Sequence, residues 1–378
     1  MRVLHVSEAL GGGITSSILA MVEATPQIDH HLLARPRSGH ETGADVGAAF
    51  GSVALLPHDP VRAVLSVRRQ ARELFPDIVH AHSSIAGAVV RLAGLNGPRV
   101  VYSPHCFAFE RRDLSRVQRL AYAGIERALA PRTNVLLAVA PNEIDLAVEL
   151  GHDEVCYAPN RGAEPKETVR HRDPLHVVSV GRLCRQKDWR YLLHVKRYAE
   201  TQLGLDATWE WLGGGDPEAE RCLSAAGVQV SGWIERRDLL RRMSRAQAYL
   251  HTAAWEGAPI SVLEAAALGL PLALRAIPAL DSLRLPGRCD SVAELAHRLE
   301  TLQDPQRWQA AQRQSLALAA THSRAEQGRR LVDAYERAQD RPARVDMGSR
   351  PARVLTLAPD TARVVGRETA RAVGGTSR

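Results

Sequence analysis

The sequence offers no support for a disulfide-bonded, metal-clustered or membrane-spanning protein. It holds five cysteines, an odd number, and no two of them are spaced C-x-x-C. Scattered cysteines of this kind favour a reducing compartment over a disulfide or metal framework. No uncharged apolar run reaches the length of about 18 residues that indicates a membrane-spanning helix. Residues 1–6 lead straight into an apolar strand without a basic segment, so we expect no signal peptide and a cytoplasmic protein.

Lysine is scarce, since only Lys166, Lys187 and Lys196 interrupt the arginines among 49 cationic residues. The bias is typical of a GC-rich genome, and it makes each lysine more informative. The formal charge is +7. Residues 341–378 alone carry eight Arg against three acidic residues, so most of the excess charge belongs to this tail. We expect the tail to be disordered, and we predict no nucleic-acid partner because no basic face remains elsewhere.

Short runs rich in Val and Leu alternate with amphipathic stretches along the rest of the chain. The runs lack polar alternation, which is typical of parallel strands covered on both faces. The repeated strand–helix order predicts the α/β class with doubly wound sheets. Strands are expected at 2–7, 29–34, 53–56, 78–81, 99–103, 135–139, 155–158, 175–180, 208–212, 228–231, 248–251 and 272–274.

A polar stretch at 160–174 interrupts the pattern and indicates a linker between two domains. The expected parts are a Rossmann-like domain over 1–165, a second over 166–322, a helix over 323–340 and the tail over 341–378. We expect the helix to pack back toward the first domain. Two such domains would face each other across a cleft, which suits a substrate with two dissimilar ends.

The strongest motif has two glutamates, Glu256 and Glu264, separated by seven residues. It follows the strand expected to end at His251, and Pro259 suits the first position of a helix over 260–268. The amides and the positive dipole end of this helix would favour a diphosphate in the cleft. A carboxylate about one turn inside can accept both hydroxyls of a ribose. The alternative is a glutamate on a solvated helix face.

The second motif runs Gly181-Arg182-Leu-Cys-Arg185-Gln-Lys187, directly after the first strand of the second domain. Gly181 allows a tight exit from that strand. Arg182 and Lys187 would then lie at the carboxyl edge of the sheet and stabilise charge on a departing diphosphate without a metal. Arg185 and the other cations could equally belong to a solvated loop.

These two motifs together resemble those of the family-4 retaining glycosyltransferases of the GT-B fold, also described as glycosyl transferases group 1. The resemblance covers roughly residues 2–340. Three further segments agree with it: Leu212-Gly-Gly-Gly-Asp216, Ser231-Gly-Trp-Ile234 and Leu263-Glu-Ala-Ala-Ala-Leu-Gly-Leu-Pro271. The absence of D-x-D, the usual metal anchor of the other main glycosyltransferase fold, also agrees. The family implies a metal-independent enzyme without cofactors, whose first domain is the acceptor side and whose second binds the nucleotide sugar.

The resemblance also implies roles for individual residues. Arg182 and Lys187 contact the donor diphosphate, Glu264 binds the ribose and Glu256 faces the transferred sugar. Ile234 approaches the base. Together with His105, the residues Glu256, Lys187 and Arg182 form the expected catalytic set. The stretch that cradles the sugar and phosphates is Gly257, Ala258, Pro259, Ile260 and Ser261.

The first domain contributes a glycine run and two histidines. Gly11, Gly12 and Gly13 follow the first strand and permit close approach of a phosphate or an acceptor, although they also suit a plain flexible turn. Ser16 replaces the third glycine of the dinucleotide fingerprint, which disfavours a nicotinamide enzyme. His105 follows a buried strand at the carboxyl edge, where the family places a histidine near the sugar. Alternation along the strand expected at 78–81 puts His80 and His82 on one side, and His82, nearer the cleft, joins the glycine run as a contact for a phosphate or the acceptor.

Several alternatives stay open. The loop at 276–281 departs from the family pattern, with Asp281 in place of the usual acid, so it does not define the donor sugar. The donor nucleotide is expected to be UDP or GDP. A GT-B epimerase or hydrolase and a non-enzymatic sugar-nucleotide scaffold are the competing functions. The acceptor would be a sugar or a lipid-linked sugar. Arginines and apolar residues over 107–120 predict peripheral contact with an anionic membrane, unless they form a solvated helix face.

Overall fold

The computed structural model describes residues 1–36, 44–164 and 168–341. Within these ranges, thirteen strands form two sheets, and every pair of neighbouring strands is parallel. The strands are β1 Arg2–Leu10, β2 Asp29–Pro36, β3 Ser52–Leu55, β4 Ile78–His82, β5 Arg99–Ser103, β6 Val135–Ala138, β7 Val155–Tyr157, β8 Leu175–Val180, β9 Ala207–Leu212, β10 Val228–Val230, β11 Ala248–His251, β12 Leu272–Arg275 and β13 Arg288–Cys289.

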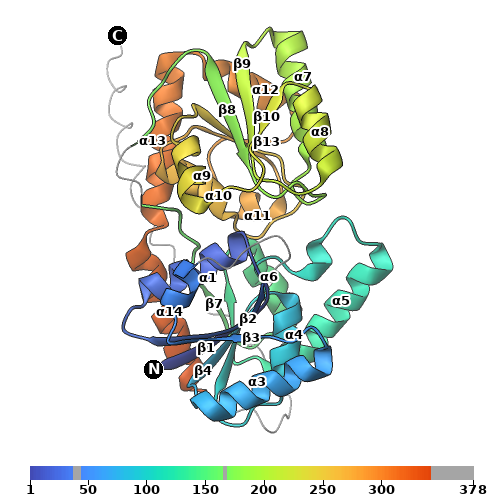
Figure 1. Ribbon diagram of the computed structural model, residues 1–378, viewed down its shortest axis with the longest axis vertical. Helices are drawn as coiled ribbons and strands as arrows, with labels where there is room; N and C mark the ends of the chain where they lie inside the picture. The colour runs from blue at the N-terminus through green and yellow to red at the C-terminus, as the bar shows by residue number, and fades with distance from the viewer. Residues whose placement is uncertain (37–43, 165–167, 342–378) are drawn as a thin grey trace, which may run out of the picture.

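The first sheet has the order β3-β2-β1-β4-β5-β6-β7, and the second has the order β10-β9-β8-β11-β12-β13. Each order reverses once, between β1 and β4 and between β8 and β11, which is the signature of a doubly wound sheet. The predicted α/β class is therefore confirmed. Figure 1 shows the two sheets in separate halves of the molecule, one above the other.

Helices cover both sheets, and several of them begin at a residue whose side chain caps the helix. Asp59, Ser115 and Asp304 each accept a hydrogen bond from the backbone N–H three residues further on. The helices are α1 Gly13–Ala24, α2 Ala44–Ala48, α3 Pro60–Leu74, α4 Ser84–Leu92, α5 Arg116–Leu129, α6 Pro141–Glu149, α7 Trp189–Leu203, α8 Pro217–Ala225, α9 Arg236–Met243, α10 Ile260–Ala267, α11 Pro278–Ser282, α12 Val292–Thr301, α13 Pro305–Thr321 and α14 Arg324–Gln339. Within the described ranges, no helix is both long and apolar enough to cross a membrane.

Two local expectations were wrong in detail. Pro259 is the N-cap of α10 with an extended backbone, φ −69° and ψ 116°, so it precedes the helix and is not its first residue. The loop expected at 276–281 instead contains the short helix α11. Pro278 at its first turn favours this helix, because its fixed φ is already helical and its missing N–H would have no partner there.

The last helix returns to the first sheet. In Figure 1, α13 runs beside the upper sheet and α14 continues beside the lower one. α14 packs against α1 and against β4 to β7, and its buried Tyr335 bonds to His80 of β4, with 2.8 Å between the Oη and Nδ1 atoms. The basic tail over 342–378 lies outside the described residues, so its disorder stays a prediction.

The α1–α14 contact generates the first prediction. A Cβ atom added at Gly328 of α14 would clash with the backbone carbonyl of Ala24. Gly328→Ala should therefore destabilise the protein by about 1–3 kcal/mol through overpacking, although alanine favours helices. The measurement is urea denaturation followed by circular dichroism.

Gly124 of α5 provides the matched control, because it is exposed and nothing lies within 4 Å of an added Cβ atom. Gly124→Ala should stabilise by about 0.5–1 kcal/mol, the ordinary effect of alanine in a helix. Equal effects of the two substitutions would contradict the proposed close contact between α1 and α14.

Candidate functional site

The candidate residues of the second domain gather where its strand order reverses. Their loops follow β8 and β11, and these two strands are neighbours in the sheet. Because parallel strands end at the same edge, the loop carrying Lys187 and the loop carrying Glu256 meet there. Ligands of doubly wound folds bind in this position.

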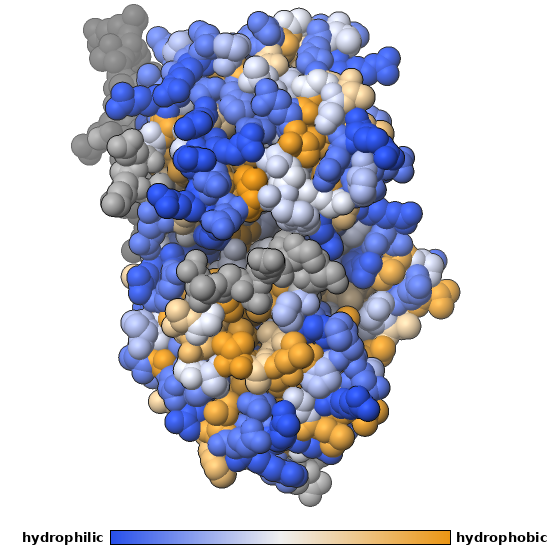
Figure 2. Space-filling view, in the orientation of Figure 1, coloured by the Kyte–Doolittle hydropathy of each residue, from blue (hydrophilic) through white to orange (hydrophobic). Residues whose placement is uncertain are grey.

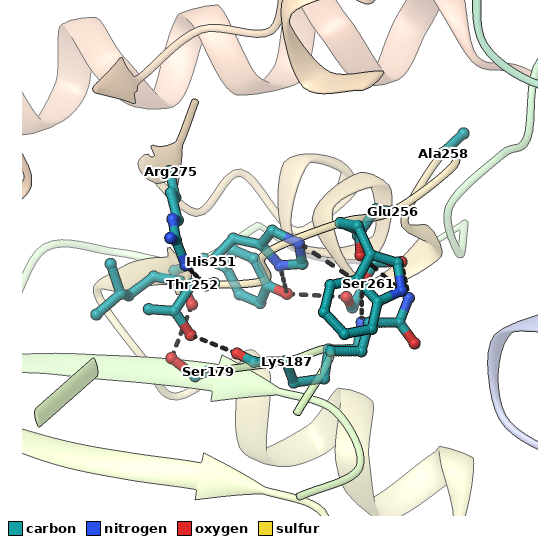
Figure 3. A network of polar contacts seen from close by, with 12 residues as sticks. Ser179, Lys187, His251, Thr252, Glu256, Ala258, Ser261 and Arg275 are labelled. Atoms are coloured by element: carbon teal, nitrogen blue, oxygen red, sulfur yellow. Dashed lines mark hydrogen bonds and ion pairs between the residues drawn. The ribbon is translucent and has the colours of Figure 1, made fainter. Parts of the chain in front are cut away.

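Lys187 and Glu256 form an ion pair, with 2.5 Å between Nζ and Oε1. Figure 3 shows the lysine extending from its loop toward the glutamate. Gly181 makes room for the lysine, since an added Cβ atom would lie 2.8 Å from Lys187 Cε. Gln186 donates a second hydrogen bond to Glu256 Oε2 at 3.2 Å. The two residues singled out by separate motifs are therefore in direct contact.

A network of buried polar side chains lies beside this ion pair (Figure 3). His251 Nε2 lies 3.9 Å from Glu256 Oε1, and Tyr249 donates a hydrogen bond to Ser261 Oγ at 2.8 Å. Burial, and secondly the charge of Lys187, lower the pKa of His251 well below its ordinary value. A neutral His251 leaves Lys187 as the cation beside Glu256.

Glu264 is buried within α10 and has a cation of its own. Arg236, at the start of α9, places Nη2 2.7 Å from Glu264 Oε1. The same guanidinium donates from Nη1 to Ser16 Oγ of α1 at 2.8 Å, so it joins the two domains. Burial raises the pKa of Glu264, and the charge of Arg236 opposes that effect. The solvated-face alternative for Glu264 is wrong, because only 4% of the residue is exposed.

Other predicted donor residues occupy the same edge with fewer contacts. Arg182 is exposed and has no hydrogen-bond or ion-pair partner among the described residues. Ile234 is half-buried against the core of the second domain. Ala258 accepts a hydrogen bond through its carbonyl from Asn160 Nδ2 at 2.9 Å, which ties this loop to the first domain.

The first domain presents its predicted residues at the facing edge. Gly12 is the N-cap of α1 with φ 60°, a conformation that favours glycine, so the run Gly11–Gly13 forms the turn into that helix. His105 follows β5 and donates or accepts a hydrogen bond with buried His82, with 3.0 Å between Nε2 and Nδ1. Both histidines thus lie together at this edge.

The two domains also approach closely where Gly257 meets the His105–Cys106 peptide. A Cβ atom on Gly257 would lie 2.9 Å from Cys106 N and 3.1 Å from Glu143 Oε1. Glu143 accepts hydrogen bonds from the amides of Cys106 at 2.6 Å and Val139 at 2.9 Å. Burial raises the pKa of Glu143 to about 7. The glycine of the Glu256 motif is therefore needed for the domains to approach.

A cavity of about 130 Å³ opens beside Glu256 between the domains. The first domain lines it with Glu110, Arg112 and Arg119, and the second contributes Trp255 and the start of α11. The lining is balanced in charge, since Arg112 and Arg119 stand against the carboxylates of Glu110 and Glu256.

Sequence reasoning missed three features of the site. Arg236 gave no signal, because it is one arginine among many. Glu143 was not noticed, since its capping role depends on a loop far away in sequence. His5 and His30, which lie behind His82, could have been suspected from their places on apolar strands, but only the strand order brings them together.

Comparison with known families identifies both halves of the chain. Residues 12–161 match the glycosyl transferase 4-like domain, and residues 174–303 match the glycosyl transferases group 1 domain. Together these two matches include every strand of both sheets except β1.

Curated relatives are distant in sequence. An uncharacterized 41.2 kDa protein in the cps region of Klebsiella pneumoniae is 24% identical over 72% of this chain and 80% of its own length. The Escherichia coli UDP-Gal:alpha-D-GlcNAc-diphosphoundecaprenol alpha-1,3-galactosyltransferase is 28% identical over 56% of this chain and 60% of its own length.

Solved structures share the fold. The Anabaena protein HepE, solved with UDP and glucose, has a TM-score of 0.72 and 16% identity over 89% of this chain and 99% of its own. The lipopolysaccharide outer core galactosyltransferase WaaB has a TM-score of 0.62 and 16% identity over 88% of this chain and 99% of its own.

Proposed function

We propose, from the premise that this chain belongs to the group 1 glycosyltransferases of family-4 type with the GT-B fold, that Lys187, Glu256 and Glu264 hold its nucleotide-sugar donor. The contact between Lys187 and Glu256 carries the proposal, because it unites two independent motifs beside the start of α10. Residues 166–322 then form the donor domain and residues 1–165 the acceptor side. The relatives named for UDP donors favour UDP over GDP.

The donor would lie along the carboxyl edge of the second sheet. Arg182 and Lys187 neutralise the diphosphate, aided by the amides at the start of α10. Glu264 accepts hydrogen bonds from the ribose hydroxyls. The Arg236 side chain must therefore move away from Glu264 or change its contact when the nucleotide binds. Glu256 faces the sugar, and Ile234 lies toward the base.

We infer transfer with retention of configuration from the resemblance to the retaining family-4 enzymes, since the placement of the carboxylates alone does not decide it. Glu256 is paired with Lys187 and is not free to attack as a nucleophile. We favour front-face substitution, in which the leaving phosphate helps to deprotonate the acceptor. Growing charge on that phosphate is stabilised by Lys187 and Arg182, a preorganised electrostatic effect. The competing functions of an epimerase, a hydrolase or a non-enzymatic scaffold are disfavoured, because both halves of the chain match glycosyltransferase families.

Substitution of three residues tests the donor site. Glu264→Gln should weaken UDP binding, because charge-assisted hydrogen bonds to the ribose are worth about 1.5–3 kcal/mol. Lys187→Ala should lower kcat by on the order of 100-fold, more than it raises KM, since the charge it faces grows in the transition state. Glu256→Gln should keep UDP affinity and reduce transfer. Calorimetric titration with UDP and steady-state kinetics measure both properties.

Arg185→Ala is the matched control, because Arg185 is an exposed cation in the same loop. It should leave binding and turnover near those of the parent protein. If the three site variants also behave like the parent protein, the assignment of the donor site is wrong. UDP binding by the parent without any transfer would favour a non-enzymatic sugar-nucleotide scaffold.

We also propose that the reaction needs no metal ion. This proposal rests on two features of the sequence: it contains no D-x-D metal-binding motif, and Arg182 and Lys187 are the cations proposed to contact the diphosphate. Turnover of UDP-glucose or UDP-galactose should survive an excess of EDTA. Loss of turnover with EDTA, restored by magnesium or manganese, would refute metal independence.

The surface of α5 beside the cavity favours a lipid-linked acceptor. Arg112 and Arg119 line the cavity, and α5 beside it leaves 76% of Val117 and 63% of Leu120 exposed. Phe107, expected to add apolar surface, is fully buried and cannot contribute. An apolar pair flanked by arginines suits an anionic membrane surface. The free cysteines favour its cytoplasmic side.

Liposome sedimentation tests this membrane contact in the full chain. A Val117→Ser, Leu120→Ser double variant should co-sediment less with anionic vesicles than the parent at low salt, since apolar burial contributes to binding. Leu55→Ser, at a residue with 68% exposure on β3, serves as the control and should bind like the parent. Equal binding of all three proteins would assign the interaction to charge elsewhere.

A further inference from the structure

Four histidines form a continuous hydrogen-bonded row behind the cleft, here called the histidine row: His30, His5, His82 and His105. The nitrogen–nitrogen distances are 3.0 Å from His30 to His5, 2.9 Å from His5 to His82 and 3.0 Å from His82 to His105. His30, His5 and His82 are buried, and His105 stands half-buried at the cleft. The row therefore links the site to the interior of the first sheet.

The register of the first sheet produces the row. His5 pairs with Leu32 on β2 and with His80 on β4, while His82 pairs with Ser103 on β5. Each step to the next strand thus moves two residues toward the carboxyl edge. A two-residue step keeps side chains on one face, so the four imidazoles follow a diagonal across adjacent strands.

Thr25 fixes the direction of the hydrogen bonds. The Thr25 hydroxyl donates to the carbonyl of Met21 at 2.8 Å, and both Thr25 Oγ1 and the Thr25 carbonyl lie within 3.2 Å of His30 Nε2. A carbonyl can only accept, so His30 Nε2 carries the proton. A neutral imidazole has one donor and one acceptor. His5, His82 and His105 must then also carry their proton on Nε2.

A metal ion is a poorer explanation of the cluster. His5, His80 and His82 bring ring nitrogens within 4.8 Å of one another. Both nitrogens of His5 and of His82 are used within the row, and His80 bonds to Tyr335 at 2.8 Å and Ser103 at 3.0 Å. A metal would have to displace these hydrogen bonds.

We propose that His30, His5 and His82 are positioning residues that lock His105 in the Nε2–H tautomer and leave its Nδ1 as an acceptor for a sugar hydroxyl. This inference rests on the proposed donor site. A proton on Nδ1 could travel along the row only as far as the Thr25 carbonyl, which cannot take it. The row orients His105 and does not conduct protons out of the site.

The lock matters because positive charge develops on the sugar as its bond to the phosphate breaks. A neutral acceptor nitrogen stabilises that charge, whereas an imidazolium would oppose it. Burial lowers the pKa of His105 to about 4 and also lowers the pKa of His5, His30 and His82. Other titratable groups lie next to the row. His80 packs against His82 and bonds to Tyr335, and His31, paired with Asp29, follows His30 in the chain.

Nitrogen NMR on the parent protein with ¹⁵N-labelled histidine tests the tautomers directly. At pH 7 all four members should show a protonated Nε2 and an unprotonated Nδ1. A protonated Nδ1 on any of them, or an imidazolium, would overturn the lock without any variant having to fold.

Two substitutions at His30 test the effect on function. His30→Leu removes the anchor, so His105 should show mixed tautomers and kcat for UDP-glucose or UDP-galactose hydrolysis should fall about tenfold, the scale of one hydrogen bond. UDP affinity should stay near that of the parent, because His30 is buried in the first domain and the proposed nucleotide site lies in the second. His30→Gln can donate to Thr25 and accept from His5, so it should restore the tautomer and the rate.

His31→Gln, next in sequence but outside the row, should match the parent. If His30→Leu keeps the parent's kcat while the parent hydrolyses UDP-sugars, the functional role of the row is wrong and the donor site stands. If the parent neither binds UDP nor turns over, the proposed function fails, and the NMR measurement still decides the tautomers.

Discussion

Parallel pairing of the strands in both sheets is the constraint on which the rest of the structure depends. It collects the carboxyl ends of the strands at one edge of each sheet, and the two edges face each other. Loops that are 69 residues apart, those of Lys187 and Glu256, therefore meet in an ion pair. The same constraint turns histidines on four separate segments into one row.

Electrostatics at these edges follow one pattern, in which buried carboxylates have nearby partners. Glu256 is paired with Lys187, Glu264 with Arg236, and Glu143 with two backbone amides. Burying an unpaired charge is costly, so such partners are required for the folded state. The partner of Glu264 comes from an arginine that also touches Ser16 of the other domain. Nucleotide binding at Glu264 would thus be coupled to the contact between domains.

Small residues decide how closely the parts approach. Gly181 leaves space for the side chain of Lys187. Gly257 lets the loop after β11 contact the His105–Cys106 peptide, and Gly328 lets α14 pack closely against α1. A side chain at any of these positions would meet backbone or a buried chain. The glycines of the motifs are therefore explained by packing as well as by chemistry.

Local chemistry determined much of this protein from sequence alone. Apolar runs without alternation predicted parallel strands, and the spacing of Glu256, Glu264, Arg182 and Lys187 predicted an anion-binding edge, because these features depend on neighbours in the chain. Tertiary structure alone decided that Arg236 reaches Glu264, that Phe107 is buried in the core of the first domain, and that His30 and His5 stand behind His105. Those contacts depend on strand order and register, which bring together residues that carry no mutual signal in the sequence.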